Sequence, residues 1–375
     1  MKYFDHAATT PVHPLVAEEM QKWLTEGYFN ASSLYQGGRM ARAAVEGARE
    51  KVRELIGAQT GSLIFTSGGT ESDNTAIIGC ALKNRGKRKA VAVSAIEHHA
   101  VLESCEFLKQ LGFEARILPV DGCGRIDMAE YKRLVDENVL LVSVMWANNE
   151  IGTIQDIPEL ARIAHEKGAF FHTDAVQALP YISLDVKSCG ADMVSVSAHK
   201  ICGPKGCGAL WVKDPAIIQP FMHGGQQEDR LRGGTENVAA IAGFGKAAEI
   251  LAKTREENAE GARQRREFVF EQMKKAGARI NTPMECSVPG ILNIAFKDVE
   301  AEGVLFFLNM EGFCISIGSA CNSKSVEPSH VVRAIGIPEE YARGCLRISF
   351  GCGQTIEDAA ALTEAVLRIA AQQRG

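Results

Sequence analysis

The chain has 375 residues, a formal net charge of −5 and 46% hydrophobic residues. Its isoelectric point near 6.0 shows no excess of positive charge that would indicate direct nucleic-acid binding. No apolar run approaches the ~18 residues of a membrane span. A chain of this length usually has more than one core, so two domains are expected. The first ten residues lack an export signal. The eleven cysteines are therefore expected to be mostly free thiols in a reducing cytoplasm.

Strand-like and helix-like patterns alternate over the first half of the chain. Short apolar runs rich in β-branched residues predict strands at residues 63–66, 91–95, 140–146, 169–173, 193–196 and 209–212. Amphipathic stretches between them, such as residues 157–167, carry apolar residues at helical spacing. This alternation predicts an α/β domain with a mostly parallel sheet flanked by helices.

The pattern changes after residue 235. Residues 236–276 are rich in Ala, Glu, Lys and Arg, which predicts one or two helices leaving the large domain. The remainder suits a smaller α+β domain, with strands at 291–296 and 346–350 and helices at 301–310 and 356–372. We expect residues 15–255 to form the large domain, and residues 1–14 and 256–375 to form the small one.

Lys200 follows directly on a predicted core strand, and a Gly-Pro pair at 203–204 marks a turn shortly after it. Loops at this position build active sites in α/β folds. A desolvated lysine can form a Schiff base with a carbonyl compound. On this motif alone, an ordinary surface lysine is the simpler interpretation.

Three other strand ends carry polar residues that suit a cofactor or ligand. Gly-Gly-Thr at residues 68–70 opens a helix, where N–H groups and the helix dipole favour a phosphate. Asp174 could keep a pyridinium nitrogen protonated, and His98 could stack on a ring or carry a proton.

Asn149 ends a further strand, and its amide could bind a ligand oxygen. Each of these residues also has a plain structural interpretation, as a tight turn, a helix cap, a loop histidine or a turn asparagine. Strand ends of an open α/β sheet meet in one crevice, however, and this convergence favours a shared site.

The second half of the chain adds two candidates. Cys321 lies in a loop of small residues from 317 to 325, and an exposed thiol there can act as a nucleophile if its pKa falls. Arg347 is a charge within a predicted apolar strand, and arginine suits the bidentate grip of a carboxylate. An unreactive surface cysteine and an ion pair at a sheet edge are the structural alternatives.

Taken together, these motifs resemble the NifS/IscS-type cysteine desulfurases, in the class V branch of fold-type I pyridoxal 5'-phosphate (PLP) enzymes. The resemblance extends from Y-F-D-H-A-A-T-T at residues 3–10 to residue 351. Between them, in the family's order, stand S-G-G-T-E-S-D-N, E-H-H-A-V, N-N-E-I-G, H-T-D-A-V-Q, S-A-H-K and G-S-A-C-N-S. The resemblance implies a fold-type I large domain and a smaller α+β domain that carries the Cys321 loop.

The same resemblance implies site roles. Lys200 would hold PLP and carry a proton, His98 would stack on its ring, and Cys321 would be the nucleophile. Asp174 would pair with the ring nitrogen and Gln177 with the ring hydroxyl. The phosphate would be bound by Gly69, Thr70, Ser197 and His199, together with Thr235 from the other subunit of a homodimer. The substrate carboxylate would be bound by Asn149 and Arg347, with Asn30 nearby. Asn149 would also lie against the cofactor, and no metal is expected.

The implied activity is the removal of sulfur from L-cysteine, giving L-alanine and a Cys321 persulfide. An acceptor protein would then take this sulfur for Fe–S cluster assembly or tRNA thiolation, without membrane attachment. A selenocysteine lyase or another class V aminotransferase is the alternative, and an aminotransferase would not need Cys321. A binding protein on the same fold and a Cys/His metal protein are the other classes considered.

The chain departs from the family pattern at Tyr35, where the family has His, and at Ala198, where it has Gly. These changes bear on substrate positioning and not on the reaction class. Four further cysteines lie near the predicted site segments. Without a convincing zinc spacing they are expected to be plain buried thiols: Cys202, Cys207, Cys345 and Cys352.

Overall fold

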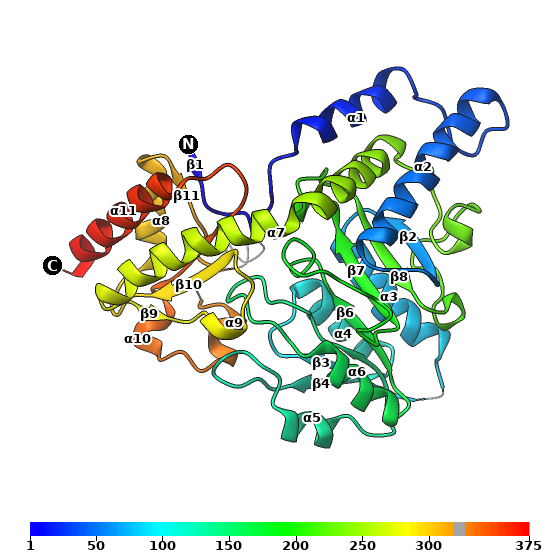
Figure 1. Ribbon diagram of the computed structural model, residues 1–375. Helices are drawn as coiled ribbons and strands as arrows, with labels where there is room; N and C mark the ends of the chain where they lie inside the picture. The colour runs from blue at the N-terminus through cyan, green and yellow to red at the C-terminus, as the bar shows by residue number, and fades with distance from the viewer. Residues whose placement is uncertain (87, 319–326, 375) are drawn as a thin grey trace.

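The computed structural model describes residues 1–86, 88–318 and 327–374. These residues form a seven-stranded sheet, a three-stranded sheet and a two-stranded pair. The two larger sheets, each with its own helices, lie side by side, and the long helix α7 (Val238–Lys275) runs from one to the other (Figure 1). In the part of the chain described, no helix is both long and apolar enough to cross a membrane.

The large sheet has the strand order β2-β8-β7-β6-β5-β3-β4. Strand β8 is antiparallel to both of its neighbours, and the other neighbouring pairs are parallel, which confirms a mostly parallel sheet. Its strands are β2 (Ser62–Thr66), β3 (Ala90–Ser94), β4 (Glu114–Leu118), β5 (Val139–Ser143), β6 (Phe170–Asp174), β7 (Met193–Ser197) and β8 (Gly208–Val212).

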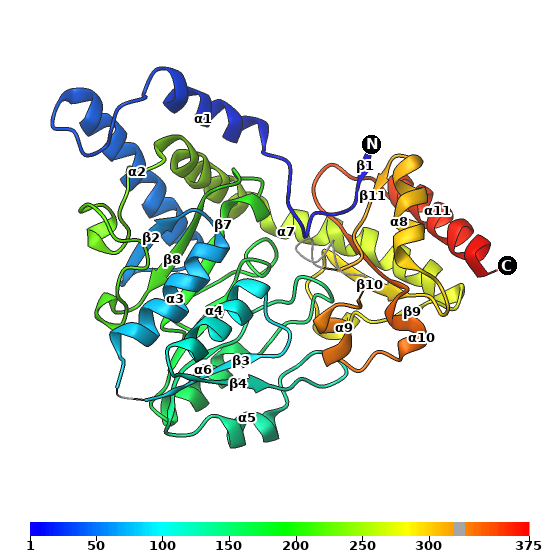
Figure 2. The ribbon, with the colours of Figure 1, turned by 180° about the vertical axis from the view of Figure 1, so that it is seen from behind.

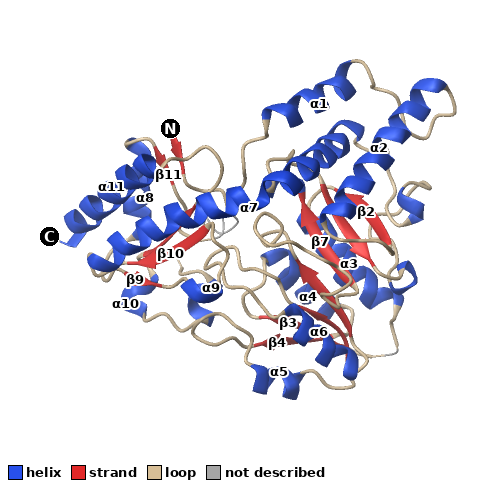
Figure 3. Ribbon diagram, viewed as in Figure 1, coloured by secondary structure: helices blue, strands red, loops and turns tan. Residues whose placement is uncertain are grey.

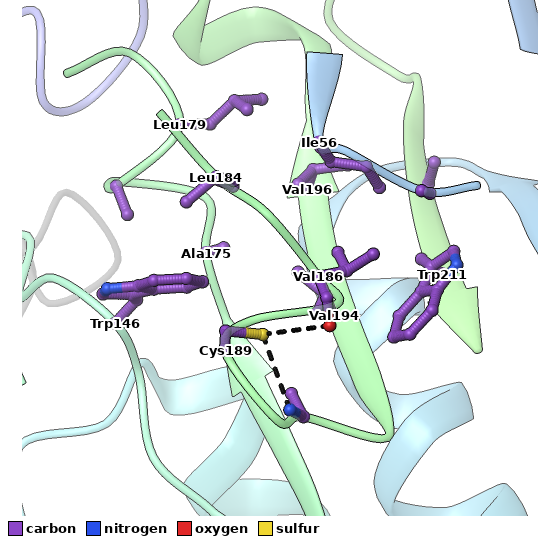
Figure 4. Packing of buried hydrophobic residues seen from close by; sticks show 14 of the residues in the cluster. Ile56, Trp146, Ala175, Leu179, Leu184, Val186, Cys189, Val194, Val196 and Trp211 are labelled. Carbon is purple, nitrogen blue, oxygen red and sulfur yellow. Dashed lines mark hydrogen bonds between the residues drawn. The ribbon is translucent and has the colours of Figure 1, made fainter. Parts of the chain in front are cut away.

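Helices cover both faces of this sheet (Figure 3). Alternate residues of β7 show the two faces: Val194 and Val196 pack in one core, and Met193 packs in the other. Figure 4 shows the first of these cores, with Val194 and Val196 among buried residues such as Trp211. Burial on both faces explains why these strands read as continuous apolar runs.

The first core contains side chains of α2 (Gln36–Leu55), α6 (Ile157–Glu166) and the beginning of α7. The second contains side chains of α3 (Gly69–Lys83) and α4 (His99–Gln110). Two further helices of this half are α1 (Pro14–Thr25) and α5 (Met128–Leu134).

Helix α7 is continuous and joins two cores. Its side chains up to Leu251 pack beneath the large sheet, and those from Ala262 onward pack in a separate core around the three-stranded sheet. Gly245 lets α2 approach, because a Cβ there would lie 2.6 Å from Cα of Ala48. The predicted domain boundary at residues 255/256 falls where the core changes, and the division itself stays a prediction.

The three-stranded sheet has the antiparallel order β12-β10-β9. The chain's beginning returns to this half, because β1 (Lys2–Tyr3) pairs with β11 (Phe313–Cys314), as the view from behind shows (Figure 2). The other elements are β9 (Arg279–Ile280), β10 (Ile291–Ala295), α8 (Ala301–Met310), α9 (His330–Ala334), α10 (Glu339–Ala342), β12 (Cys345–Ser349) and α11 (Ile356–Arg374).

Candidate active site

A cavity of about 240 Å³ lies at the carboxyl ends of the central strands, between the large sheet and β12. Most of the site residues that the sequence predicts line it together: Gly69, Thr70, His98, Asn149, Asp174, Gln177, Ser197, His199, Lys200 and Arg347. Strand ends that are far apart in sequence therefore do converge on one crevice, as expected for an open α/β sheet. The cavity is also lined by Ala7, Ala8, Asp73, Met145 and Val176.

Lys200 ends a single turn of 3₁₀ helix (Ala198–Lys200) that follows β7. Its Nζ donates one hydrogen bond to the main-chain carbonyl of Ala8, at 2.8 Å, and another to the carbonyl of Ala7. The N-terminal segment therefore holds the amine in the cavity wall. Sequence reasoning missed Ala7 and Ala8 because they act through main-chain oxygens, which no residue type reveals.

Asp174 ends β6 and is 6% exposed. Its Oδ1 accepts a hydrogen bond from the N–H of Val176, at 2.8 Å. Burial raises its pKa to about 6, although this N–H and the charge of Lys200 oppose the rise. A carboxylate in such a place is stabilised by a cation in the cavity. This geometry suits the predicted pairing with a protonated ring nitrogen, and Asp174 does not serve as a helix cap.

A second carboxyl group, Asp73 of α3, also lines the cavity and is buried. Burial and the charge of Asp174 raise its pKa well above the usual range, so it holds a proton more firmly than an ordinary aspartate. Its Oδ1 has no hydrogen-bond partner among the described residues. The sequence analysis missed Asp73, although it stands in the quoted S-G-G-T-E-S-D-N motif.

His172, two residues before Asp174 on β6, is fully buried. Its Nδ1 lies 2.8 Å from Ser143 Oγ, and its Nε2 lies 2.9 Å from Ser195 Oγ. Burial lowers its pKa to about 3, so the ring is neutral and its 3.7 Å approach to Asp73 is not an ion pair. These hydrogen bonds link the neighbouring strands β5, β6 and β7 through buried polar side chains.

Two neutral histidines face the cavity. His98 caps α4, because its Nδ1 accepts the N–H of Ala100 at 3.1 Å. Burial, helped by the charge of Lys200, lowers its pKa to about 4. The same two causes lower the pKa of His199 to about 4, and its Nδ1 lies 3.1 Å from Thr9 Oγ1. His98 is thus both a helix cap and a cavity residue, and at neutral pH its ring can stack or donate a hydrogen bond from Nε2.

The beginning of α3 forms the other end of the cavity. Gly68 precedes the helix with φ +151°, which favours glycine, and the N–H groups of the first turn are available to an anion. Ser197 Oγ is buried there without a hydrogen-bond partner in the part of the chain described. A Cβ on Gly69 would lie 3.0 Å from Val176 Cγ2. These features fit the phosphate of PLP, and Asp174 fits its ring.

Two predicted residues do not line this cavity. Thr235 is exposed in the loop after Arg232, whose Nε bonds Glu71 Oε1 at 2.9 Å and ties that loop to α3. Its predicted role from a partner subunit stays a prediction. Asn30 is also exposed, and its Oδ1 accepts the N–H of Ser32 at 2.8 Å.

Arg347 of β12 crosses from the smaller sheet into the cavity and is 1% exposed. Its Nη2 lies 2.7 Å from Asp5 Oδ1, and its Nη1 donates to the carbonyl of Asn149 at 3.0 Å. Its Nε has no hydrogen-bond partner among the described residues. The arginine therefore forms an ion pair on an edge strand of the smaller sheet, as the structural alternative expected, and its side chain also lines the cavity.

Cys321 lies outside the described residues. Beyond its loop, Ser329 caps α9 and donates to Glu150 Oε2 at 2.6 Å. Cys207 and Cys345 are buried as predicted. The prediction of a buried thiol is wrong for Cys352, which is exposed in the loop after β12, and Cys202 is only partly buried because it follows the 3₁₀ turn outside the sheet.

Comparisons with known proteins agree with this geometry. The family model for class-V aminotransferases matches residues 2–362. The cysteine desulfurase IscS of Dictyoglomus turgidum is 46% identical, over 95% of this chain and 91% of its own. The solved structure of a NifS-like protein covers 99% of both chains with TM-score 0.93 and 34% identity. The structure of SspA in complex with cysteine covers 95% of this chain and 100% of its own, with TM-score 0.83 and 35% identity.

Proposed function

The chain belongs to the class-V aminotransferase family, and from that premise we propose that it is a PLP-dependent cysteine desulfurase that converts L-cysteine to L-alanine. One observation carries the proposal: an amine, a buried carboxyl group, a neutral histidine and a buried arginine face one cavity, namely Lys200, Asp174, His98 and Arg347. The desulfurase name of the 46% identical relative and the cysteine bound to the similar SspA structure support this choice of substrate.

PLP would be held by Lys200, Asp174 and the beginning of α3, and when bound it supplies an electron sink for the substrate's α-carbon. The guanidinium of Arg347 binds the substrate carboxylate and orients it in the cavity. Lys200 takes the α-proton at its Nζ and returns it later. The neutral His98 ring would stack on the cofactor and donate a hydrogen bond from Nε2 during the proton transfers, because its Nδ1 accepts the N–H of Ala100.

Cys321 completes the reaction. Its thiolate attacks the sulfur of L-cysteine, so that an S–S bond forms while the substrate's C–S bond breaks. A proton then replaces sulfur on the substrate β-carbon to give alanine, and Cys321 keeps the sulfur as a persulfide. A downstream acceptor protein for Fe–S cluster assembly or tRNA thiolation would remove that sulfur, in the cytoplasm.

We further propose that the enzyme is a homodimer. The connection between α1 and α2 exposes large apolar side chains, with Leu34 89% and Tyr28 71% exposed. Surfaces of this kind mark protein–protein contacts. Thr235, exposed on a loop anchored to α3, would contribute to the phosphate site of the second subunit.

Alanine formation from L-cysteine in the presence of a thiol reductant tests the function. Wild type should form alanine, and Lys200→Ala should lose at least about 10³-fold in rate because the amine acts directly in the chemistry. Lys213→Ala, an exposed lysine, is the matched control and should retain full activity.

The alternatives give different results in this assay. A selenocysteine lyase would release alanine from L-selenocysteine and almost none from L-cysteine. A class V aminotransferase would pass the amino group to a 2-oxo acid. Absence of alanine from wild-type protein that carries PLP would overturn the desulfurase proposal.

A further inference from the structure

A second cavity, of about 250 Å³, lies next to the first. Lys200 and Gln177 line both cavities. The rest of its wall comes from the N-terminal segment, from Pro180 and Tyr181 after β6, from α7 and from the segments that follow Lys200 and β12. The reaction proposed above uses none of these remaining residues, so the second cavity needs another explanation.

Two free thiols line this cavity. Cys202 stands two residues after Lys200, and Cys352 stands in the loop after β12. Both side chains line the same cavity, and each thiol changes the acidity of the other. Cys352 is exposed and Cys202 is partly buried, so small molecules can reach the pair.

The backbone fixes Cys202 in place. Its N–H donates to Thr10 Oγ1 at 2.9 Å, and its carbonyl accepts the N–H of His13 at 2.9 Å. It has φ +60°, in the left-handed region that non-glycine residues seldom adopt.

The residue before Cys352 is held as well. The carbonyl of Gly351 accepts from Arg265 Nη2 at 2.9 Å, and its N–H donates to Gln354 Oε1 at 3.0 Å. Separate segments of the chain therefore present the two thiols to the same cavity.

The two thiols differ in acidity. The neighbouring thiol of Cys352 lowers the pKa of Cys202 to about 7, assisted by Thr10 and opposed by burial. The neighbouring Cys202, together with burial, raises the pKa of Cys352. Near neutral pH, Cys202 therefore supplies a substantial thiolate fraction while Cys352 keeps its proton. This is the division between an attacking and a resolving thiol in disulfide exchange.

We propose that Cys202 and Cys352 form a second thiol site that reacts with low-molecular-weight disulfides. The Cys202 thiolate attacks one sulfur of the small disulfide, forms a mixed disulfide and releases one small thiolate. Cys352 then passes its proton to solvent and attacks Cys202 Sγ, which releases the second small thiol. The two cysteines lose two electrons in total, and the small disulfide gains them.

A Cys202–Cys352 disulfide would join the segment that follows Lys200 to the loop that follows Arg347's strand. No third His, Cys, Asp or Glu joins the pair to make a metal-binding cluster within the described residues. A small disulfide is therefore the ligand class that the pair suits. This thiol site does not depend on the proposed desulfurase reaction.

Oxidised glutathione is the probe, added to the full-length protein in a Cys321→Ala background so that this thiol does not compete. Peptide mapping without reductant should find the Cys202 peptide linked to the Cys352 peptide. With Cys352→Ser, glutathione should stay attached to Cys202. With Cys202→Ser, the link should disappear and Cys352 should carry no glutathione. Cys123→Ser, which removes an exposed thiol elsewhere, is the control and should leave the link unchanged.

Two results would overturn the proposal. One is a Cys352→Ser protein that unfolds at the wild-type temperature yet carries no glutathione on Cys202. The other is a protein with Cys202 and Cys352 intact in which glutathione attaches but no link between these cysteines forms. Neither readout measures alanine, so both remain valid if the desulfurase proposal fails.

Discussion

Arg347, which lines the site cavity, forms an ion pair with Asp5, with Arg347 Nη2 2.7 Å from Asp5 Oδ1. Asp5 also bridges to Ser349 of the same strand, so the chain's beginning and β12 are joined around this charge. A buried guanidinium needs such a partner, because an uncompensated charge in the interior is costly. The ion pair keeps the Arg347 guanidinium oriented before a substrate carboxylate binds.

Replacing Arg347 with lysine tests the role of the guanidinium in substrate binding. Lysine preserves the positive charge but offers a point charge in place of two parallel donors. We expect Arg347→Lys to raise KM for L-cysteine by about tenfold, which corresponds to about 1.4 kcal/mol, with a smaller effect on kcat. Arg343→Lys, an exposed arginine paired loosely with Glu300 at 3.7 Å, serves as the control and should leave KM unchanged. An unchanged KM in Arg347→Lys would show that Arg347 does not bind the substrate.

Asp174 should make the stability of the cofactor-free protein depend on pH. Its pKa is raised to about 6 in the folded protein, so the folded state holds this proton more tightly than the unfolded state. The proton on Asp174 therefore stabilises the folded state fully below about pH 4, and this stabilisation is lost as the pH rises through about 6. Above that, the ionised carboxylate costs up to about 3 kcal/mol.

Asp174→Asn removes this cost. In urea unfolding of cofactor-free protein, the variant should be about 2 kcal/mol more stable than wild type at pH 8 and no more stable at pH 4. Asp229→Asn, at an exposed position of a 3₁₀ turn (Glu228–Arg230), should change nothing at either pH. A variant that is destabilised at pH 8 would contradict this account of Asp174. The same variant should bind PLP more weakly, because the ring nitrogen loses its anionic partner.

Mixed dimers test whether Thr235 acts across subunits. Thr235→Glu would repel the cofactor phosphate, and Lys200→Ala removes the amine, so each homodimer should be inactive. If Thr235 serves the partner's site, a mixed dimer contains one intact site, and random assembly restores roughly a quarter of wild-type activity. If Thr235 serves its own subunit, both sites of the mixed dimer are damaged and no activity returns.

Sequence patterns predicted the central strands well because apolar runs between helices leave few alternatives. The edge strand β4 (Glu114–Leu118) was missed, since its charged and half-exposed residues do not form an apolar run. The antiparallel direction of β8 was also not predicted, because a run of apolar residues carries no information on strand direction. Helix α7 is one helix, and the composition had left one or two open.

The site was predictable where a side chain follows a strand, as for Lys200 and Asp174. It was not predictable where distant segments meet. Ala7 and Ala8 hold Lys200 through main-chain oxygens, and the placement of Cys202 and Cys352 on one cavity depends on how the loop after β12 folds back. Such contacts are set by tertiary packing and leave no local signal.

The sulfur removed from L-cysteine can be followed directly on Cys321. Wild type and Cys321→Ala, both loaded with PLP, are mixed with one equivalent of L-cysteine without reductant, and alanine and the mass of the Cys321 peptide are determined. We predict about one alanine per site in wild type with one extra sulfur on the Cys321 peptide, and almost no alanine from the variant. Equal amounts of alanine from the two proteins would contradict a mechanism in which Cys321 accepts the sulfur.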